Sequence, residues 1–410
     1  MNNKKAVLIS PQFPRTYYKF AEALRLRGWT VLGIGDTPYA SLPYELTQNL
    51  NEYYYCPNMN DYAELYKAVA FFSFKYGKID LIESNNEYWL EKDARLREDF
   101  NCLEGFRVDE IRALKAKSYM KKFYQLAGVP FARYRLVDDL KGCMSFIQEV
   151  GLPVFVKPNV GVGSVSAKKI DSLAKLELFL STKDEATYIM EEFVEGTTIS
   201  YDGMCNDRSE VVFEVAHVYP ISNHEVTNAL SEDYYYTEPH VPEDLAAIGH
   251  RVVQAFGLKK RFFHLEFFRL NRDHPYLGKK GTIVALEANL RTPGGYTPEM
   301  INASQSLNCY AVWADVMTLN ENRQSNLLPK FYCAVIARRD SKSYTLNHQE
   351  IMEKYANTMV FEGRYPPVIN VGMGDQFYMV KVSSVEACES FKNDLLKPKI
   401  QTITWTKTGS

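Results

Sequence analysis

The sequence predicts a multidomain chain of mixed α/β and α+β class. Three observations support this class: a parallel β-α-β pattern at the N-terminus, a small mixed block after residue 128, and a later series of strands interrupted by one clear helix. With 410 residues, the chain also exceeds one ordinary hydrophobic core, so two or three domains are expected.

The N-terminal residues predict a small parallel α/β domain over residues 1–112. Lys5–Ser10 is a short apolar run typical of a buried strand, and TYYKFAEALRLRG has helical spacing that ends at Gly28. WTVLGIGD then provides a second strand. A later strand, KIDLIESNNEYW, ends in polar residues, where parallel sheets usually contact their ligands.

The next segment predicts a small α+β subdomain over residues 129–196. It follows a helix expected over about Arg112–Ala127, which ends at Gly128 before Pro130. The strands FARYRLV, PVFVKP and YIMEEFVEG alternate with helices expected near Met144–Val150 and Ser172–Leu180. A glycine-containing segment, NVGVGSVSAKKI, follows the second of these strands.

Longer strands dominate the rest of the chain. TISYDGMCN, VVFEVAHVY, FFHLEFFRL and TIVALEANL accompany one helix, Pro242–Phe256. The last two strands are joined by a loop too short for a crossover helix, so they should pair antiparallel. We expect a central domain over residues 113–321 and a C-terminal antiparallel-sheet subdomain over 322–410, which ends with the helix VEACESFKNDLL.

The composition argues against several classes of function. The chain has 48 Lys plus Arg against 50 Asp plus Glu, a net charge of −2, which offers no electrostatic case for nucleic acid or an anionic membrane. Its seven Cys include no C-x-x-C pair, which predicts reduced thiols and no zinc site. The N-terminal apolar run is too short for a signal sequence. We therefore expect a cytoplasmic protein with small polar ligands.

The stretch LEANLRTPGG places unlike polar groups at alternate positions. In a strand, Glu287, Asn289 and Arg291 would share one face, while Leu286 and the intervening apolar residues would share the other. A solvated edge strand would show the same pattern, so this stretch alone leaves both interpretations open.

A second motif, VFVKPNVGVGSVSAKK, places Lys157 at the end of an apolar strand and before a glycine loop. A fixed cation beside free backbone N–H groups is suited to polyphosphate. The loop lacks the Gly-Lys-Ser/Thr of a Walker motif and the third glycine of a dinucleotide fingerprint. A protein kinase would have its lysine after the loop.

The order of motifs along the whole chain resembles the ATP-grasp superfamily. Lys117 precedes Gly128-Val129-Pro130 by eleven residues, and VFVKP, the glycine loop, MEEFVEG, HLEFF and LEANLR follow in turn. The superfamily includes biotin carboxylase, the carbamoyl phosphate synthase large subunit and the L-amino-acid ligases. HLEFF and NLRTPGG are most similar to the H-x-E and N-x-R-x-G-G segments of carboxylate-amine ligases. The resemblance implies a pre-ATP-grasp domain followed by an ATP-grasp fold in which residues 129–196 form the lid.

The resemblance also implies an ATP site. Lys117 and Lys157 would hold the α- and β-phosphates, and the loop around Gly161, Gly163 and Ser164 would close over them. Glu191 would accept from the adenine amino group, and backbone groups of Glu192 and Val194 would contact the ring edge. The ring would lie between Phe155 and Leu286. Many relatives have a ribose-binding Glu where this chain has Thr198.

The implied metal ligands are Glu266, Glu287 and Asn289, which would hold two Mg²⁺ ions, with Mn²⁺ as an alternative. Arg291 would stabilise an acyl-phosphate as the catalytic cation. The expected substrate-binding residues are Glu87, Arg291, Gly294 and Gly295. We expect His264 to be a packed strand histidine, and the tyrosines of EYYYCP and DYYYTEPH to be exposed turn and sheet residues.

The function implied is that of an ATP-dependent carboxylate-amine ligase that forms an amide through an acyl-phosphate and releases ADP and phosphate. Its partners would be a small carboxylate and an amine, without nucleic acid or membrane, and a homodimer is left open. One alternative is a carboxylase or carbamoyl-phosphate-type enzyme that phosphorylates bicarbonate. Another, from a different class, is a non-catalytic ATP-binding regulatory protein.

Overall fold

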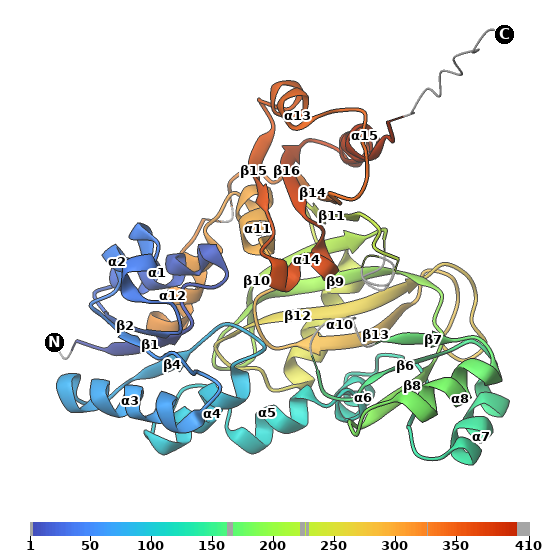
Figure 1. The fold of residues 1–410 in the computed structure, drawn as a ribbon, viewed down its shortest axis with the longest axis horizontal. Helices are drawn as coiled ribbons and strands as arrows, with labels where there is room; N and C mark the ends of the chain where they lie inside the picture. The colour runs from blue at the N-terminus through green and yellow to red at the C-terminus, as the bar shows by residue number, and fades with distance from the viewer. Residues whose placement is uncertain (1–2, 162–166, 222–225, 227–228, 326, 400–410) are drawn as a thin grey trace, which may run out of the picture.

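The computed structural model describes residues 3–161, 167–221, 226, 229–325 and 327–399. Its N-terminal part is a four-stranded sheet in the order β3-β2-β1-β4, in which every pair is parallel. The strands are β1 (Lys5–Ile9), β2 (Thr30–Gly35), β3 (Glu52–Tyr55) and β4 (Leu81–Glu83). Helices α1 (Tyr18–Arg25), α2 (Tyr44–Asn49), α3 (Tyr62–Tyr76) and α4 (Leu90–Asp99) surround it (Figure 1). The predicted parallel β-α-β unit is confirmed.

The helix expected over about Arg112–Ala127 is in fact two helices, so this prediction was wrong. They are α5 (Val108–Lys115) and α6 (Lys117–Leu126), and Ala116 between them has an extended backbone with φ −80° and ψ 115°. The N–H of the first residue of α6 donates over 2.8 Å to the carbonyl of Asn159. This contact with a distant segment accompanies the break, which no proline or glycine marks in the sequence.

A separate four-stranded sheet forms the predicted small subdomain. Its order is β5-β8-β6-β7, and its pairs are antiparallel. The strands are β5 (Tyr134–Leu136), β6 (Val154–Pro158), β7 (Lys168–Ile170) and β8 (Tyr188–Glu192), and the helices are α7 (Leu140–Val150) and α8 (Leu173–Thr182). An apolar cluster that includes Phe146, Val156 and Phe179 joins helices and sheet. We call this unit the lid.

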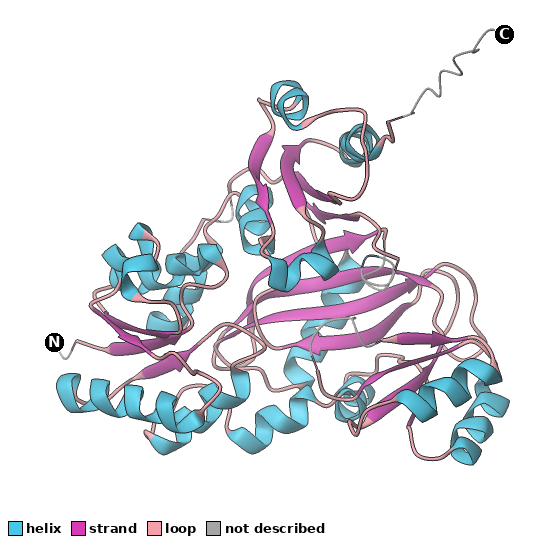
Figure 2. Cartoon of the chain, viewed as in Figure 1, coloured by secondary structure: helices cyan, strands magenta, loops and turns pink. Residues whose placement is uncertain are grey.

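The centre of the molecule is an eight-stranded sheet in the order β13-β12-β9-β10-β11-β14-β16-β15, whose pairs are antiparallel. Figure 2 shows this sheet extending, strand after strand, from the lid side toward the C-terminal helices. The strands are β9 (Gly196–Cys205), β10 (Val211–Tyr219), β11 (Asp233–Glu238), β12 (Arg261–Leu270), β13 (Ile283–Asn289), β14 (Tyr332–Arg338), β15 (Met359–Arg364) and β16 (Gln376–Val382). The expected antiparallel pairing of FFHLEFFRL with TIVALEANL is confirmed.

The tyrosines of the DYYYTEPH segment were expected to be exposed turn and sheet residues, and the expected exposure is wrong for Tyr234 and Tyr235. The first six residues of this segment form β11 in the interior of the eight-stranded sheet, where Tyr234 and Tyr235 are buried. Tyr235 stacks on Tyr219, and its hydroxyl lies 2.9 Å from the hydroxyl of Thr297. The segment is rich in aromatic residues because it has sheet neighbours on both sides, which composition alone did not reveal.

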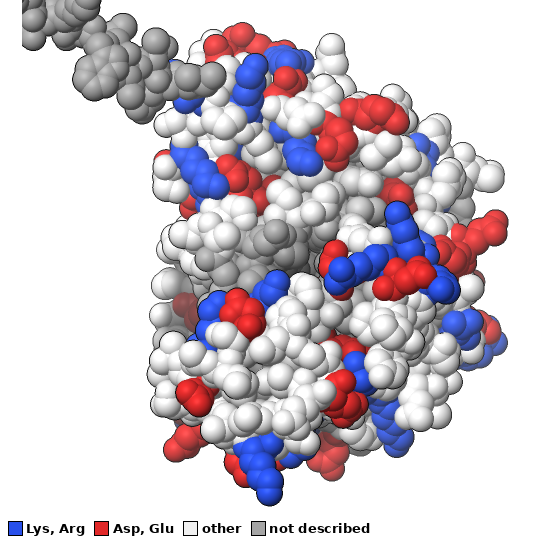
Figure 3. All heavy atoms as spheres, turned by 90° about the vertical axis from the view of Figure 1, so that its right-hand side faces the viewer, with Lys and Arg blue, Asp and Glu red and all other residues white. Residues whose placement is uncertain are grey.

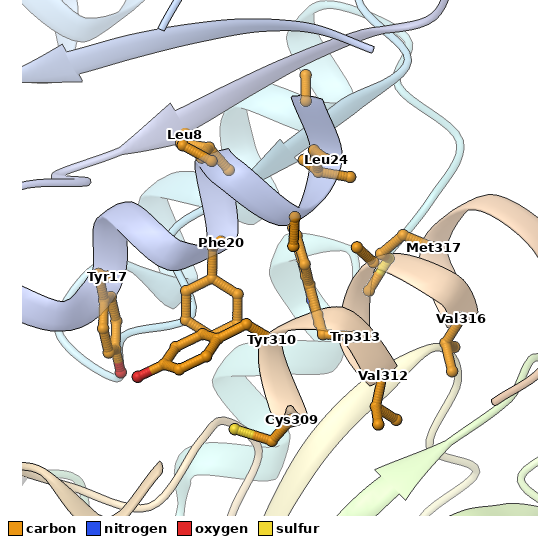
Figure 4. Close-up of a cluster of buried hydrophobic side chains, with 14 of the residues drawn as sticks. Leu8, Tyr17, Phe20, Leu24, Cys309, Tyr310, Val312, Trp313, Val316 and Met317 are labelled. Carbon is orange, nitrogen blue, oxygen red and sulfur yellow. The ribbon is translucent and has the colours of Figure 1, made fainter. Parts of the chain in front are cut away.

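The remaining helices are α10 (Glu243–Ala255), α11 (Thr297–Gln305), α12 (Cys309–Leu319), α13 (His348–Lys354), α14 (Pro367–Met373) and α15 (Val385–Leu396). Helix α12 returns to the N-terminal sheet and packs against α1 (Figure 4). In this cluster Phe20 makes edge-to-face contacts with Tyr310 and Trp313, at ring-centroid distances of 4.8 and 5.0 Å. Residues of α1 and α12, which lie far apart in the sequence, therefore share one core.

Every helix in the described part of the chain is too short or too polar to cross a lipid bilayer. Figure 3 shows basic and acidic side chains interspersed on the face that carries the lid, in keeping with the nearly balanced charge. The domain boundaries near residues 112 and 321 stay a prediction.

Candidate active site

The end of β13 carries the polar side chains that the sequence singles out. Glu287, Asn289 and Arg291 are partly exposed, whereas Ala288 and Leu290 between them are buried. The alternation expected from LEANLR is therefore present from Glu287 to Arg291, whereas Leu286, expected on the buried face, is partly exposed. We call Glu287, Asn289 and Arg291 the shelf.

The neighbouring strand β12 adds a second carboxylate to the shelf. Glu266 is the register partner of Glu287, and His264 is the partner of Asn289. Each carboxylate already holds a cationic or hydrogen-bonding group: Lys117 Nζ lies 3.2 Å from Glu287 Oε1, and His264 Nε2 lies 3.0 Å from Glu266 Oε1. Two carboxylates that face each other across adjacent strands repel unless cations lie between or beside them.

This donor set fits a divalent cation with a preference for oxygen. Mg²⁺ is usually held by one or two carboxylates together with water and phosphate oxygens, and the shelf offers Glu266, Glu287 and the amide of Asn289. Among the residues that the structure describes, no group of three or more His, Cys, Asp or Glu could hold a metal. An ion at the shelf would therefore complete its coordination with phosphate oxygens or water.

The two lysines expected to bind phosphates approach the shelf from different elements. Lys117 is the first residue of α6, and its Nζ donates to the carbonyl of Gly161 over 3.1 Å. Lys157 lies on β6, and both lysines are more than nine-tenths buried. The other two loop residues of the prediction, Gly163 and Ser164, lie outside the described residues.

Glu191 holds a buried group of three charges. Lys121 Nζ lies 2.5 Å from Glu191 Oε1, and Lys157 Nζ lies 2.8 Å from Glu191 Oε2. Burial acts to raise the pKa of Glu191, but the two ammonium groups outweigh it and hold the pKa at about 2. Burial lowers the pKa of Lys121, whereas Glu191 outweighs burial at Lys157 and raises its pKa. Of these residues, Lys121 was not among the site residues predicted from the sequence.

The residues expected around the nucleobase are dispersed around this group. Phe155 on β6 is the register partner of Glu191, and Leu286 precedes the shelf on β13. Val194 is buried in a small apolar cluster beside the lid sheet. The side chain of Glu192 pairs with Arg133 over 2.7 Å, and its N–H donates to the Arg133 carbonyl. That N–H is therefore already occupied in this arrangement.

His264 belongs to a buried chain of polar side chains that leads to Glu266. Its Nδ1 contacts Asp202 on β9, and the other oxygen of Asp202 lies 2.7 Å from His217 Nδ1. Asp202 and His217 are both fully buried, and Ser200 also donates to Asp202. Burial acts to lower the pKa of His264, but Asp202 outweighs it and raises the pKa to about 9. His264 is thus buried on its strand, as expected, and it also links two carboxylates.

The N-terminal sheet contributes the residues nearest Arg291. The turn after β4 contains Asn85 with a positive φ of 55°, and it places Glu87 so that its Oε2 lies 3.5 Å from Arg291 Nε. Lys115 Nζ lies 3.8 Å from the other oxygen. Glu87 is largely buried, yet its Oε2 finds no hydrogen-bond donor among the described residues. This carboxylate is therefore held by ion pairs with Arg291 and Lys115.

The two glycines after the shelf differ in surroundings. A side chain at Gly294 would meet no atom within 4 Å. At Gly295, φ is +59° and a Cβ would lie 2.5 Å from the Met373 side chain. Both the conformation and the close contact favour glycine there. Thr198, where many relatives have a ribose-binding Glu, is 7% exposed on β9, so little of its hydroxyl can reach a ligand.

Several residues near the site escaped the sequence analysis. Lys121 stands in a KK pair that looks like solvated helix surface, and Asp202 and His217 occupy unremarkable strand positions. The hydroxyls of Tyr17 and Thr292 lie 2.6 Å apart and connect the N-terminal part of the chain to the residues that follow β13. No distinctive signal in the sequence marks Asp202 and His217, because their strands also contain other polar residues such as Ser200 and Glu214.

The sequence of the chain is similar to those of known ligases. No family model matches the chain. It is similar to the L-arginine-specific L-amino acid ligase of Bacillus subtilis, with 22% identity over 270 residues, 64% of this chain and 62% of that protein. The match thus spans less than two thirds of the relative's length.

Solved structures match over nearly the full length. The L-amino acid ligase of Bacillus licheniformis has a TM-score of 0.75 at 16% identity, covering 98% of this chain and 100% of that one. The biotin carboxylase domain dimer of the Hydrogenobacter thermophilus 2-oxoglutarate carboxylase, in complex with MgADP, ADP and bicarbonate, has a TM-score of 0.68 at 13% identity, covering 98% and 91%. The chain therefore has the fold of ATP-grasp ligases, and its homologues and structural neighbours are ligases of this type.

Proposed function

We propose that this chain is an ATP-dependent ligase that joins a small carboxylate to an amine through an acyl-phosphate, with release of ADP and phosphate. The observation that carries the proposal is the shelf. Glu266, Glu287 and Asn289 present oxygen ligands on adjacent strands, and Lys117 contacts one of these carboxylates. The named ligases among the relatives support the same reaction type.

The residues of the site would take different parts in the reaction, beginning with the binding of ATP and metal. Lys117 and Lys157 would bind the phosphates of ATP, and Glu191 lies where it could accept from the base. Mg²⁺, when bound to Glu266, Glu287 and Asn289, would neutralise the phosphates and orient the transferred group; the MgADP complex of the carboxylase neighbour supports this pairing of ion and nucleotide. Two ions are proposed, with Mn²⁺ as a substitute.

Arg291 would act at the next step. A guanidinium beside the shelf can donate to the oxygens of a phosphorylated carboxylate as charge develops there. Glu87, which lies within 3.5 Å of Arg291 Nε, would bind a cationic group of a substrate. Gly294, with open space where a side chain would be, and Gly295 would admit the substrate carboxylate close to the backbone.

The proposal is tested by ADP release from ATP with pooled amino acids and other small carboxylates, with and without amines. A carboxylate alone should give slow release, because an acyl-phosphate without an acceptor stays in the site, and addition of an amine should accelerate it. Full turnover with bicarbonate alone would favour the carboxylase alternative. Nucleotide binding without any turnover across the pool would favour a regulatory ATP-binding protein.

A further inference from the structure

The second buried lysine next to Glu191 has no role in the function proposed so far. Lys121 is 2% exposed on α6, and among the described residues its only ion pair is with Glu191, at 2.5 Å. A buried ammonium group is costly to desolvate unless a carboxylate compensates it. The burial of Lys121 therefore needs a reason other than the usual one for a lysine on a helix, which is contact with solvent.

The charge balance around Glu191 points to that explanation. Lys157 alone with Glu191 would be a compensated ion pair, with one negative and one positive charge. Lys121 adds a second positive charge in a region of low dielectric, where the interaction between charges is stronger than in water. The group of three then carries a net positive charge next to the phosphate-binding glycine segment.

Geometry assigns the two lysines to different oxygens of the carboxylate. Lys121 takes Oε1 and Lys157 takes Oε2 at 2.8 Å, and the two cations do not compete for one atom. Lys157 extends from β6, the strand that precedes the glycine segment, whereas Lys121 lies on α6 with its Nζ 5.7 Å from the ring centroid of Phe131. Of these two lysines, the proposed ATP site assigns the phosphate contact to Lys157.

We propose that Lys121 is a positioning residue for phosphate binding: by compensating Glu191, it leaves the charge of Lys157 available to the nucleotide. Without Lys121, Glu191 would hold Lys157 as a closed ion pair, and a phosphate would have to compete with that carboxylate. The inference rests on the proposed function only in taking ATP or ADP as the ligand.

The competing explanation is that Lys121 merely anchors α6 to β8. The two explanations differ in ligand dependence. An anchor would affect stability and the binding of every ligand alike, whereas compensation of Glu191 should affect ligands that carry phosphates much more than adenosine, which would meet this group only through the hydrogen bond from its amino group to Glu191.

The test measures ADP and adenosine affinity, without divalent cations, for the full chain. Lys121→Met removes the charge and keeps the length of the side chain, and it should weaken ADP binding about tenfold, the scale of one lost charge-assisted interaction. Adenosine binding, followed by ligand-observed NMR, should stay within about twofold. Lys122→Met is the matched control, because Lys122 is the exposed neighbour on the same helix, and it should leave both affinities unchanged.

Two further variants separate charge from shape. Lys121→Gln keeps a hydrogen-bond donor without the charge, so it should lose ADP affinity as Lys121→Met does; wild-type affinity in this variant would overturn the proposal. In a Glu191→Gln background nothing remains to be compensated, so Lys121→Met should have no further effect on ADP. An additive loss would overturn the coupling.

The remaining outcomes separate the two levels of inference. If the wild-type chain binds neither ADP nor adenosine, the proposed function fails. If it binds ADP and Lys121→Met binds equally well, only the role of Lys121 fails. Equal loss of both ligands together with a lower melting temperature would show a structural anchor and also overturn the proposal.

Discussion

We expect Asp93→Asn to remove a pH dependence of stability that originates in the N-terminal part of the chain. Asp93 is fully buried on α4, where the hydroxyl and N–H of Ser84 donate to its Oδ2 over 2.5 and 3.0 Å. Burial and the nearby Glu83 carboxylate raise the pKa of Asp93 to about 7. Both guanidiniums of the cluster, from Arg97 and Arg261, contact Glu83 over 3.0 and 2.9 Å.

The sign follows because the folded-state pKa of Asp93 lies above that of the unfolded chain. The stabilisation is complete below about pH 4, where both states are protonated. Between about pH 4 and pH 7 the unfolded chain releases the proton while the folded chain keeps it, so stability falls as pH rises. With pKa values of 3.8 and about 7, the loss between pH 5 and pH 8 is about 2.6 kcal/mol.

Urea unfolding of wild type and Asp93→Asn at these two pH values measures the effect. Asparagine keeps the shape and an accepting oxygen for Ser84 but cannot ionise, so the variant should gain stability over the wild type at pH 8. Other titrating groups are common to both chains and cancel in the difference. A difference that stays the same at both pH values would refute the reasoning, as would an infrared signal of buried protonated carboxyl groups that is no smaller in the variant than in the wild type.

Three further predictions concern the site. Lys157→Ala should weaken ATP binding in calorimetry because a phosphate-binding cation is lost, and unchanged affinity would contradict that role. Glu287→Gln should weaken both Mg²⁺ dependence and nucleotide binding, whereas Arg291→Lys should keep Mg·ATP affinity and lower kcat by roughly two to three orders of magnitude. Measuring Mg·ATP affinity and kcat for each variant checks both expectations. If Arg291→Lys lost ATP binding but kept its rate, the roles of the two residues would be reversed. Asp202→Asn should weaken Mg²⁺ activation about tenfold or more through His264, with metal-free ATP binding unchanged; titration of Mg²⁺ at saturating ATP tests this.

The features that the sequence predicted well are those with local periodicity. The alternation of Glu287, Asn289 and Arg291 follows directly from strand geometry, and the parallel N-terminal unit follows from short apolar runs separated by an amphipathic helix. The order of the lysines, glycine loop and carboxylates can be read directly from the sequence, which is why the resemblance to ATP-grasp ligases was visible before the fold was known.

The features that it missed depend on neighbours distant in sequence. The break at Ala116 accompanies a contact with Asn159, and the burial of Tyr234 depends on strands that flank β11 on both sides. The same holds for Lys121, whose environment is set by Glu191 on the lid sheet. Nothing within a few residues of these positions signals such contacts, so periodicity and propensity describe them as ordinary surface.

The packing of α12 on α1 has a consequence for synthesis on the ribosome. Phe20 and Leu24 find Trp313 and Met317 in the same core, yet almost three hundred residues separate the two helices. At about 5–20 residues per second, roughly fifteen to sixty seconds pass between them during translation. The N-terminal sheet must therefore leave the ribosome with one apolar side uncovered. A nascent chain arrested before Cys309 should bind chaperones on that side, and a truncated protein that ends there should aggregate.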